Sequence, residues 1–233
     1  MPASTPQPAS TLGQIAVSSD GATWVWTPDR SPVFFTGDRG ATWTQSQGVP
    51  ANTRAIADRV NPRKFYALSL FDGKLFVSDD AAATFKEQPL TLPDGLPKRG
   101  GSRGDSRGMQ DRIYATPGKE GDLWLAAFNG LYRSADTGKT FARLGGVQEI
   151  HAFGFGKAAP GARDSALYLI GVVDGLRGIF RSGDAARSWV RINDDQHQWG
   201  LLLQIAGDPK QYGRVYIGTH GSGTVYGDPA GAR

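Results

Sequence analysis

Apolar residues along this chain come in short runs, and turn-forming residues interrupt them every few positions. Trp24–Trp26, Phe65–Leu68 and Leu123–Ala127 are typical runs, rich in β-branched or aromatic side chains. Gly, Pro, Asp, Asn or Ser bounds each run, as in antiparallel strands joined by tight connections. The sequence shows no sustained apolar stripe with the 3.6-residue period of a helix. The pattern therefore predicts an all-β protein.

A short polar segment recurs four times, each time between two predicted strands. The copies read TGDRGATW, SDDAAATF, SADTGKTF and SGDAARSW, and they share the pattern Ser/Thr-x-Asp-x-Gly/Ala-x-Thr/Ser-aromatic. This pattern is an Asp-box, and its aspartates are Asp38, Asp80, Asp136 and Asp184. Repeats of roughly 40–50 residues with four strands each are typical of a β-propeller. The sequence therefore predicts a propeller of about five blades.

The recurring aspartates are expected to have a structural role. A short carboxylate accepts hydrogen bonds from the backbone of its own turn, and glycine supplies a positive φ. Two copies carry Ala82 and Ala186 where the others carry Gly40 and Gly138. Those two turns either avoid positive φ or carry about 1 kcal/mol of strain. The segment Ser18–Trp24 resembles a fifth copy but is one residue short, so we expect an ordinary hairpin there.

The whole propeller is expected to be one domain, residues 11–233, and its last blade is incomplete. Residues 1–10 are expected to be a flexible stretch, and the glycine-, serine- and arginine-rich segment 96–107 a mobile basic loop. The expected blades span residues 11–50, 51–95, 108–146, 147–195 and 200–229.

Composition narrows the function classes. The formal charge is +4 and the sequence pI is about 9.4, but the basic residues are scattered, so we expect no nucleic-acid partner. The absence of cysteine excludes disulfides, thiolate zinc sites and a cysteine nucleophile. No apolar run approaches the roughly 18–20 residues of a membrane span, and the first residues lack a signal-peptide core. The three histidines lack metal-ligand spacing, and no cofactor motif is present, so neither a metal nor a cofactor is expected.

One predicted loop concentrates groups that bind sugars. Amides, carboxylates and imidazole hydrogen-bond to sugar hydroxyls, and an exposed indole can stack on a pyranose face. Loops on a rigid scaffold are where ligands commonly bind. A loop whose tryptophan fills the core is the alternative interpretation. Adjacent carboxylates seldom flank one scissile bond at the roughly 6.5–9.5 Å that inversion needs, so no catalytic residue is assigned. The candidate substrate-binding residues are Asn193, Asp194, Asp195, His197, Gln198 and Trp199.

Longer stretches of the sequence resemble one protein family. From about Thr11 onward the sequence resembles the C-terminal part of glycoside hydrolase family 74, the xyloglucan-specific endo-β-1,4-glucanases and related cellulases. The strings that carry this resemblance are RVNPRKFYAL (59–68), PGKEGDLWLA (117–126), FGFGKAAPG (153–161), RGIFRSGDAARSWVRINDDQHQWG (177–200) and GDPKQYGRVYIGTHGSGTVYGDPAG (207–231).

The resemblance implies two seven-bladed propellers in tandem, with the polysaccharide between them and two aspartates that hydrolyse the glucan with inversion. Neither catalytic stretch of the family occurs in this sequence. We therefore expect the C-terminal propeller portion of a xyloglucan hydrolase, inactive alone. Its implied partners are a β-glucan such as xyloglucan and the N-terminal propeller. The implied location is outside the cell or in the periplasm.

Two other functions are alternatives. One is a non-catalytic propeller that binds carbohydrate or protein. The other is a sialidase, which shares Asp-boxes but needs three clustered arginines and a Tyr–Glu pair. The glutamates are Glu87, Glu120 and Glu149, and none lies near a suitable tyrosine in the sequence.

Overall fold

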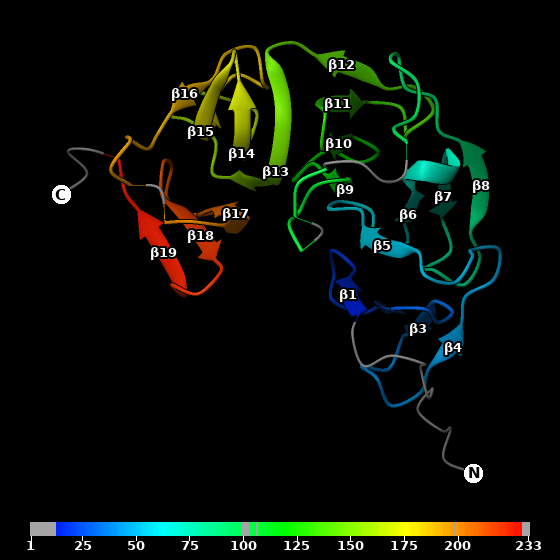
Figure 1. Ribbon diagram of the computed structural model, residues 1–233. Coiled ribbons are helices and arrows are strands. Elements are labelled where there is room, and N and C mark those ends of the chain that lie inside the picture. Colours follow the sequence, from blue (N-terminus) through cyan, green and yellow to red (C-terminus); the bar gives the residue numbers. More distant parts are fainter. Residues whose placement is uncertain (1–12, 99–102, 106, 198, 230–233) are drawn as a thin grey trace. The chain divides into compact units, whose positions relative to one another are not determined.

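The structure is a computed structural model that describes residues 13–98, 103–105, 107–197 and 199–229 (Figure 1). The expected flexible stretch 1–10 lies outside these residues, as do residues 99–102 and 106 of the expected basic loop. Within the described ranges, the elements are antiparallel strands and one 3-10 helix, η1 (Leu70–Asp72).

The strands form five antiparallel sheets, each built from strands that follow one another in the chain. The first sheet contains β1 (Gly13–Val17), β2 (Trp24–Pro28), β3 (Phe34–Thr36) and β4 (Thr44–Gln45). The second contains β5 (Arg54–Ala57), β6 (Phe65–Ser69), β7 (Lys74–Ser78) and β8 (Lys86–Pro89). The third contains β9 (Arg112–Ala115), β10 (Leu123–Ala127), β11 (Gly130–Ser134) and β12 (Ala142–Leu144).

The fourth sheet contains β13 (Val147–Gly156), β14 (Ala166–Val173), β15 (Leu176–Ser182) and β16 (Val190–Arg191). The fifth has three strands, β17 (Leu202–Gly207), β18 (Val215–Thr219) and β19 (Thr224–Gly227). The predicted fold class, an all-β propeller of about five blades, is confirmed.

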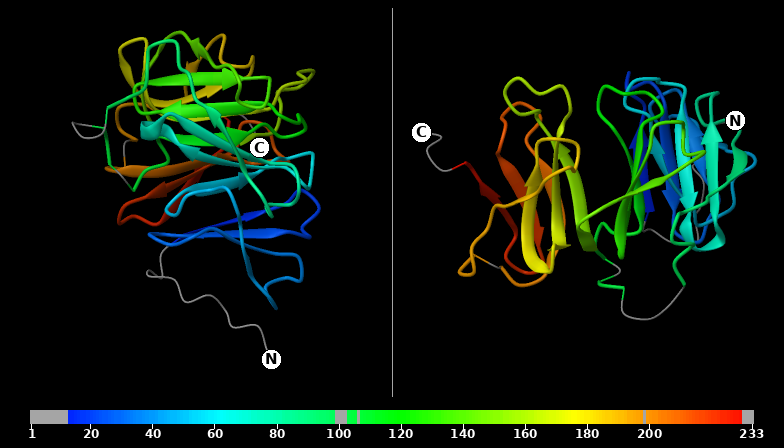
Figure 2. Two further views of the ribbon diagram at one scale, coloured as in Figure 1. Left: turned by 90° about the vertical axis from the view of Figure 1, so that its right-hand side faces the viewer. Right: turned by 90° about the horizontal axis from the view of Figure 1, so that it is seen from above.

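The chain divides into two compact units. The first comprises residues 1–99, 115–123 and 134–141, and the second comprises residues 100–114, 124–133 and 142–233. In the first unit, Val25, Phe65 and Phe76 lie in one buried cluster. In the second unit, the fourth and fifth sheets share a cluster that includes Tyr168 and Ile205. These two sheets are drawn in yellow and in orange to red in the right-hand view of Figure 2.

Burial explains the sequence pattern of individual strands. In β1, Ala16 is buried while Ile15 and Val17 are exposed, as expected for a strand with one covered face. All five residues of β10 are buried, so this strand reads as a continuous apolar run rather than an alternating one.

The four recurring aspartates lie in the turns between the third and fourth strands of the first four sheets. The Oδ1 atom of Asp184 accepts from the Ser182 hydroxyl at 2.8 Å and from the Ser188 backbone N–H at 2.9 Å, and its Oδ2 atom accepts from the Ser188 hydroxyl at 2.6 Å. Asp38, Asp80 and Asp136 accept the equivalent bonds. Hydroxyl donors lower the pKa of Asp38, Asp136 and Asp184 to about 2.

Positive φ angles occur in all four turns. Ala82 and Ala186 both have φ of 67°, beside 89° and 80° at Gly40 and Gly138. Of the two alternatives above, these alanines therefore adopt the left-handed conformation, at a cost of about 1–2 kcal/mol for an L-residue. The N–H of Ala82 donates to the Ser78 hydroxyl at 3.0 Å, and the methyl group is buried.

The segment that resembles a fifth copy is an ordinary hairpin, as predicted. It joins β1 to β2, where Val17 pairs with Trp24. Asp20 accepts from the Ser18 hydroxyl at 2.6 Å and from the Ala22 N–H at 3.0 Å.

A buried carboxylate joins two hairpins of the first unit. Asp58 Oδ2 accepts from the Tyr66 hydroxyl at 2.7 Å and from the Gly121 N–H at 3.0 Å, while its Oδ1 accepts from the N–H groups of Val60 and Asn61. Burial and the Asp58 hydrogen bond raise the pKa of Tyr66. The hairpin after β5 is thereby tied to the hairpin after β9.

Candidate functional site

The candidate sugar-binding loop, residues 192–201, connects β16 to β17. Its first residues continue the pairing of the fourth sheet beyond the end of β16. Ile192 N–H donates to the Ile179 carbonyl, and the Asn193 side-chain carbonyl accepts from the Ile179 N–H, both at 2.8 Å. Because an amide side chain replaces a backbone carbonyl here, the strand pairing ends at Asn193.

Hydrogen bonds within the loop hold its shape. Asn193 Nδ2 donates to the carbonyls of Asp194 and His197. Asp194 Oδ1 accepts from the N–H groups of Gln196 and His197 at 2.9 and 2.8 Å, and it lies 2.6 Å from His197 Nδ1. The hydrogen bond with the His197 side chain is the main cause that lowers the pKa of Asp194. Asn193 and Asp194 therefore organise the loop.

The side chains of Asp195, His197 and Trp199 are exposed. Asp195 accepts from Arg191 at 2.7 Å. His197 exposes 59% of its side chain. Trp199 is 37% exposed, and its ring centroid lies 5.7 Å from that of His197 at an interplanar angle of 44°. Gln198 lies outside the described residues.

Left-handed backbone brings Trp199 to this position. Its φ is 38°, and that of Gly200 is 65°. A bulky residue at positive φ is uncommon, and such strained positions cluster at functional sites. Trp199 is therefore held beside His197, and the alternative of an indole that fills the core does not describe its half-exposed ring.

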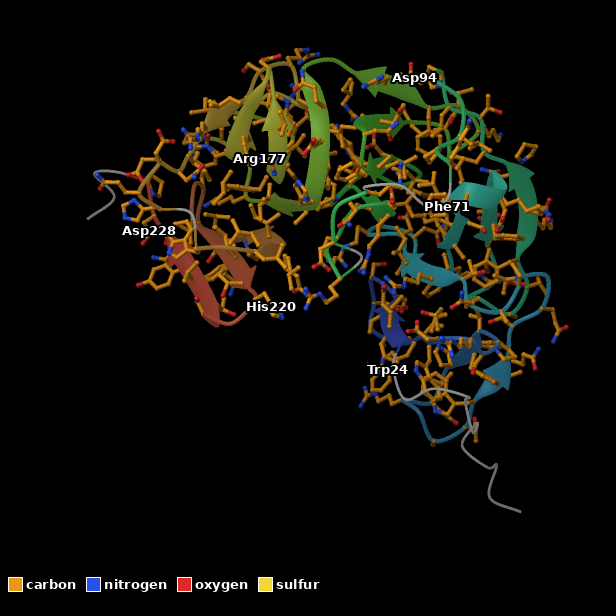
Figure 3. The ribbon with its side chains drawn as sticks, viewed as in Figure 1. Trp24, Phe71, Asp94, Arg177, His220 and Asp228 are labelled. Atoms are coloured by element: carbon orange, nitrogen blue, oxygen red, sulfur yellow. The ribbon has the colours of Figure 1, made fainter. Side chains whose placement is uncertain are left out.

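Sequence reasoning missed a second polar cluster at the same end of the fourth sheet. It contains Glu149, His151 and Arg177, which come from β13 and β15. Arg177 is labelled in Figure 3. A Cβ at Gly178, the next residue, would lie 3.0 Å from Asn193 Oδ1, so the loop begins beside the strand position that follows Arg177.

The described part of the chain has no group of three His, Asp or Glu residues placed to hold a metal ion. Across the same ranges, no helix has the length and hydropathy needed to cross a bilayer.

Comparison with known proteins identifies relatives. No family model matches the chain. A xyloglucanase from Paenibacillus is 45% identical over 233 residues, covering 97% of this chain and 21% of the relative. A xyloglucanase from Acetivibrio thermocellus is 44% identical over 220 residues, covering 94% and 24%. The crystal structure of the GH74 xyloglucanase from Xanthomonas campestris superimposes with a TM-score of 0.81 at 38% identity, covering 96% of this chain and 31% of that one.

The chain is homologous to the C-terminal part of the family 74 xyloglucanases. It spans about a fifth to a quarter of the length of these curated relatives. The family resemblance drawn from the sequence strings is therefore confirmed.

Proposed function

We propose that this chain is the polysaccharide-binding C-terminal propeller portion of a xyloglucan hydrolase, and that the 192–201 loop contacts the glucan. The observation that supports this most directly is the half-exposed indole of Trp199 beside the exposed imidazole of His197, on a loop fixed by its own hydrogen bonds. The xyloglucanase relatives supply the substrate class.

The loop offers complementary chemistry for a sugar ring. The indole provides an apolar surface for the C–H groups of a pyranose, while His197 and Asp195 hydrogen-bond to its hydroxyls. Because Asn193 and Asp194 already hold the backbone, little conformational entropy is lost on binding. The loop is thus suited to holding a glucan chain in one orientation.

The two adjacent carboxylates are unsuited to hydrolysis as a pair. Asp194 Oδ1 is committed to His197 and to two backbone N–H groups, and Asp195 is paired with Arg191. Our proposal therefore assigns this chain binding but no turnover of its own. The family resemblance implies a complete enzyme. That enzyme would contain the catalytic aspartates and the N-terminal propeller, and it would be exported from the cytoplasm.

Affinity electrophoresis in gels containing tamarind xyloglucan tests the proposal. We expect the chain to be retarded and Trp199→Ala to bind at least about tenfold more weakly, which corresponds to roughly 1.4 kcal/mol. Tyr226→Ala is the control, because Tyr226 is the more exposed aromatic side chain and lies on β19 of the same unit. Unchanged retardation of Trp199→Ala would refute the loop assignment.

A reducing-sugar assay on the same polymer addresses catalysis. We expect no release of reducing ends by this chain alone. Turnover that survives repurification would mean that the chain contains an acid pair that we have not identified.

A further inference from the structure

The inner strand of the fourth sheet, β13, is irregular at the end nearest the candidate loop. Its pairing with β14 shifts register between Val147 and Glu149 and again between Ile150 and Ala152. These two bulges place one extra residue each, Gln148 and His151, on either side of Glu149. Bulges redirect side chains and are frequent next to binding sites.

Three strands bring the charged groups together. Glu149 pairs with Val172 of β14, and Val172 pairs with Arg177 of β15, so Glu149 and Arg177 flank Val172 on one face. Arg177 Nη2 donates to Glu149 Oε2 at 3.1 Å. His151 Nε2 lies 3.5 Å from the same carboxylate oxygen and 3.4 Å from Arg177 Nη1. We call Glu149, His151 and Arg177 the β13 corner.

The base of the corner is packed. The His151 ring contacts the Phe128 ring edge to face, with centroids 5.6 Å apart at 78°. A Cβ at Gly104 would lie 3.0 Å from both His151 Nδ1 and Phe128 Cε2, so the backbone of residues 103–105 closes the Nδ1 side of the imidazole. The ring is therefore fixed, and its Nε2 faces Glu149 and Arg177.

The packing layer is itself anchored. Asp111 accepts from Arg103 Nη2 at 2.6 Å and from the Phe128 N–H at 2.9 Å. The Arg103 guanidinium carbon lies 5.7 Å from the Phe128 ring centroid. Met109 N–H donates to the His151 carbonyl at 2.9 Å. Backbone and side-chain bonds thus hold the corner before any ligand arrives, which lowers the entropy cost of binding.

The charges of the corner balance. Glu149 offsets Arg177, and burial together with Arg177 lowers the pKa of His151, which keeps the imidazole neutral near pH 7. The Glu149 carboxylate would repel an anion, and the Arg177 guanidinium would repel a cation. A neutral ligand with neighbouring hydroxyls has neither problem, because one hydroxyl can donate to Glu149 while the next accepts from Arg177.

The side chains are accessible to such a ligand. Arg177 exposes 66% of its side chain and Glu149 34%, while His151 exposes 19%. Arg177 also lies one residue from Gly178, which abuts Asn193 at the start of the candidate loop. The corner and the first residues of the loop therefore lie at the same end of the fourth sheet.

We propose that the β13 corner is a second contact site for a neutral polyhydroxyl ligand, a further sugar unit of the glucan chain held by the 192–201 loop. Glu149 accepts a hydrogen bond from one sugar hydroxyl, and Arg177 donates one to the adjacent hydroxyl. The His151 ring contacts both charged groups and positions them. This inference rests on the proposed function and adds three residues to its binding surface.

Isothermal titration with xyloglucan oligosaccharides of increasing length tests the corner. We expect Glu149→Gln, which preserves shape, and Arg177→Ala each to weaken binding of the longer oligosaccharides about five- to twentyfold. Binding of the shortest oligosaccharide that the loop retains should change by less than twofold. Arg214→Ala is the matched control, since it breaks an exposed ion pair with Asp228 in the same unit.

The outcomes separate the two proposals. If the unmodified chain binds no oligosaccharide, the proposed function and this inference both fail. If Trp199→Ala loses binding while Glu149→Gln and Arg177→Ala match Arg214→Ala at every length, the corner is refuted and the loop assignment stands. Thermal unfolding of each variant shows whether a loss reflects misfolding, and Glu149→Gln decides the matter if Arg177→Ala is unstable.

Discussion

Replacing one glycine by alanine in two equivalent turns should have unequal effects. Gly40 and Gly138 occupy the same position of the recurring turn and have φ of 89° and 80°. An L-residue at such an angle costs about 1–2 kcal/mol. This part of the cost is common to Gly40→Ala and Gly138→Ala, and two sister turns tolerate it with natural alanines.

The surroundings of the two glycines differ. A Cβ at Gly40 would lie 3.7 Å from the nearest atom, in the Trp43 ring, which is ordinary contact. A Cβ at Gly138 would lie 2.2 Å from Leu75 Cδ2 and 3.2 Å from Gln88 Nε2. Leu75 is fully buried, and Gln88 Nε2 donates to the Thr137 carbonyl at 2.9 Å. Overpacking at such a place costs about 1–3 kcal/mol more.

Urea denaturation followed by tryptophan fluorescence measures the difference. We expect Gly40→Ala to lose about 1–2 kcal/mol and Gly138→Ala about 2–5 kcal/mol. At about 2–4 °C per kcal/mol, Gly138→Ala should unfold several degrees below Gly40→Ala. In a double-mutant cycle, Leu75→Ala should relieve most of the additional cost of Gly138→Ala. Equal losses in the two single variants would refute the packing argument.

The same turns give two further predictions. Asp184→Ala removes the acceptor for three hydrogen bonds and should cost about 0.5–2 kcal/mol, while Asp195→Ala should stay within about 0.5 kcal/mol in the same urea titration. Because the pKa values of Asp38, Asp136 and Asp184 are lowered from 3.8 to about 2, their stabilisation is complete above about pH 4 and is lost as the pH falls towards 2. Unfolding free energies that stay constant from pH 5 to pH 2 would contradict this assignment.

The strands and turns could be predicted from the sequence because their determinants are local. Each recurring turn contains its own acceptor and hydroxyl donors within seven residues, as in Ser182–Ser188. The conformation of Ala82 and Ala186 could not be decided, because it depends on whether the turn's remaining bonds outweigh an unfavourable φ. The buried Asp58–Tyr66 pair was also missed. A signal existed, since Asp208 and Tyr216 repeat the same separation of eight residues and the same hydroxyl-to-carboxylate bond.

The candidate loop was found by composition, but the roles of its residues were not. Asn193 is a polar residue in the sequence, yet in the structure it takes the place of a strand carbonyl. The β13 corner has no local signal at all. It depends on two bulges and on pairing across three strands, so residues 28 positions apart in the chain, Glu149 and Arg177, meet only in the fold.

Asp58 couples the stability of two hairpins in the first unit. Its carboxylate accepts hydrogen bonds from the amides of Val60 and Asn61 in the hairpin after β5 and from that of Gly121 in the hairpin after β9. If the hairpin after β9 opens, the buried Asp58 carboxylate loses the Gly121 N–H as a donor. The hairpin after β5 then becomes less stable as well. These amides should therefore become accessible to solvent in a single concerted opening rather than one by one. A substitution that destabilises either hairpin should destabilise both.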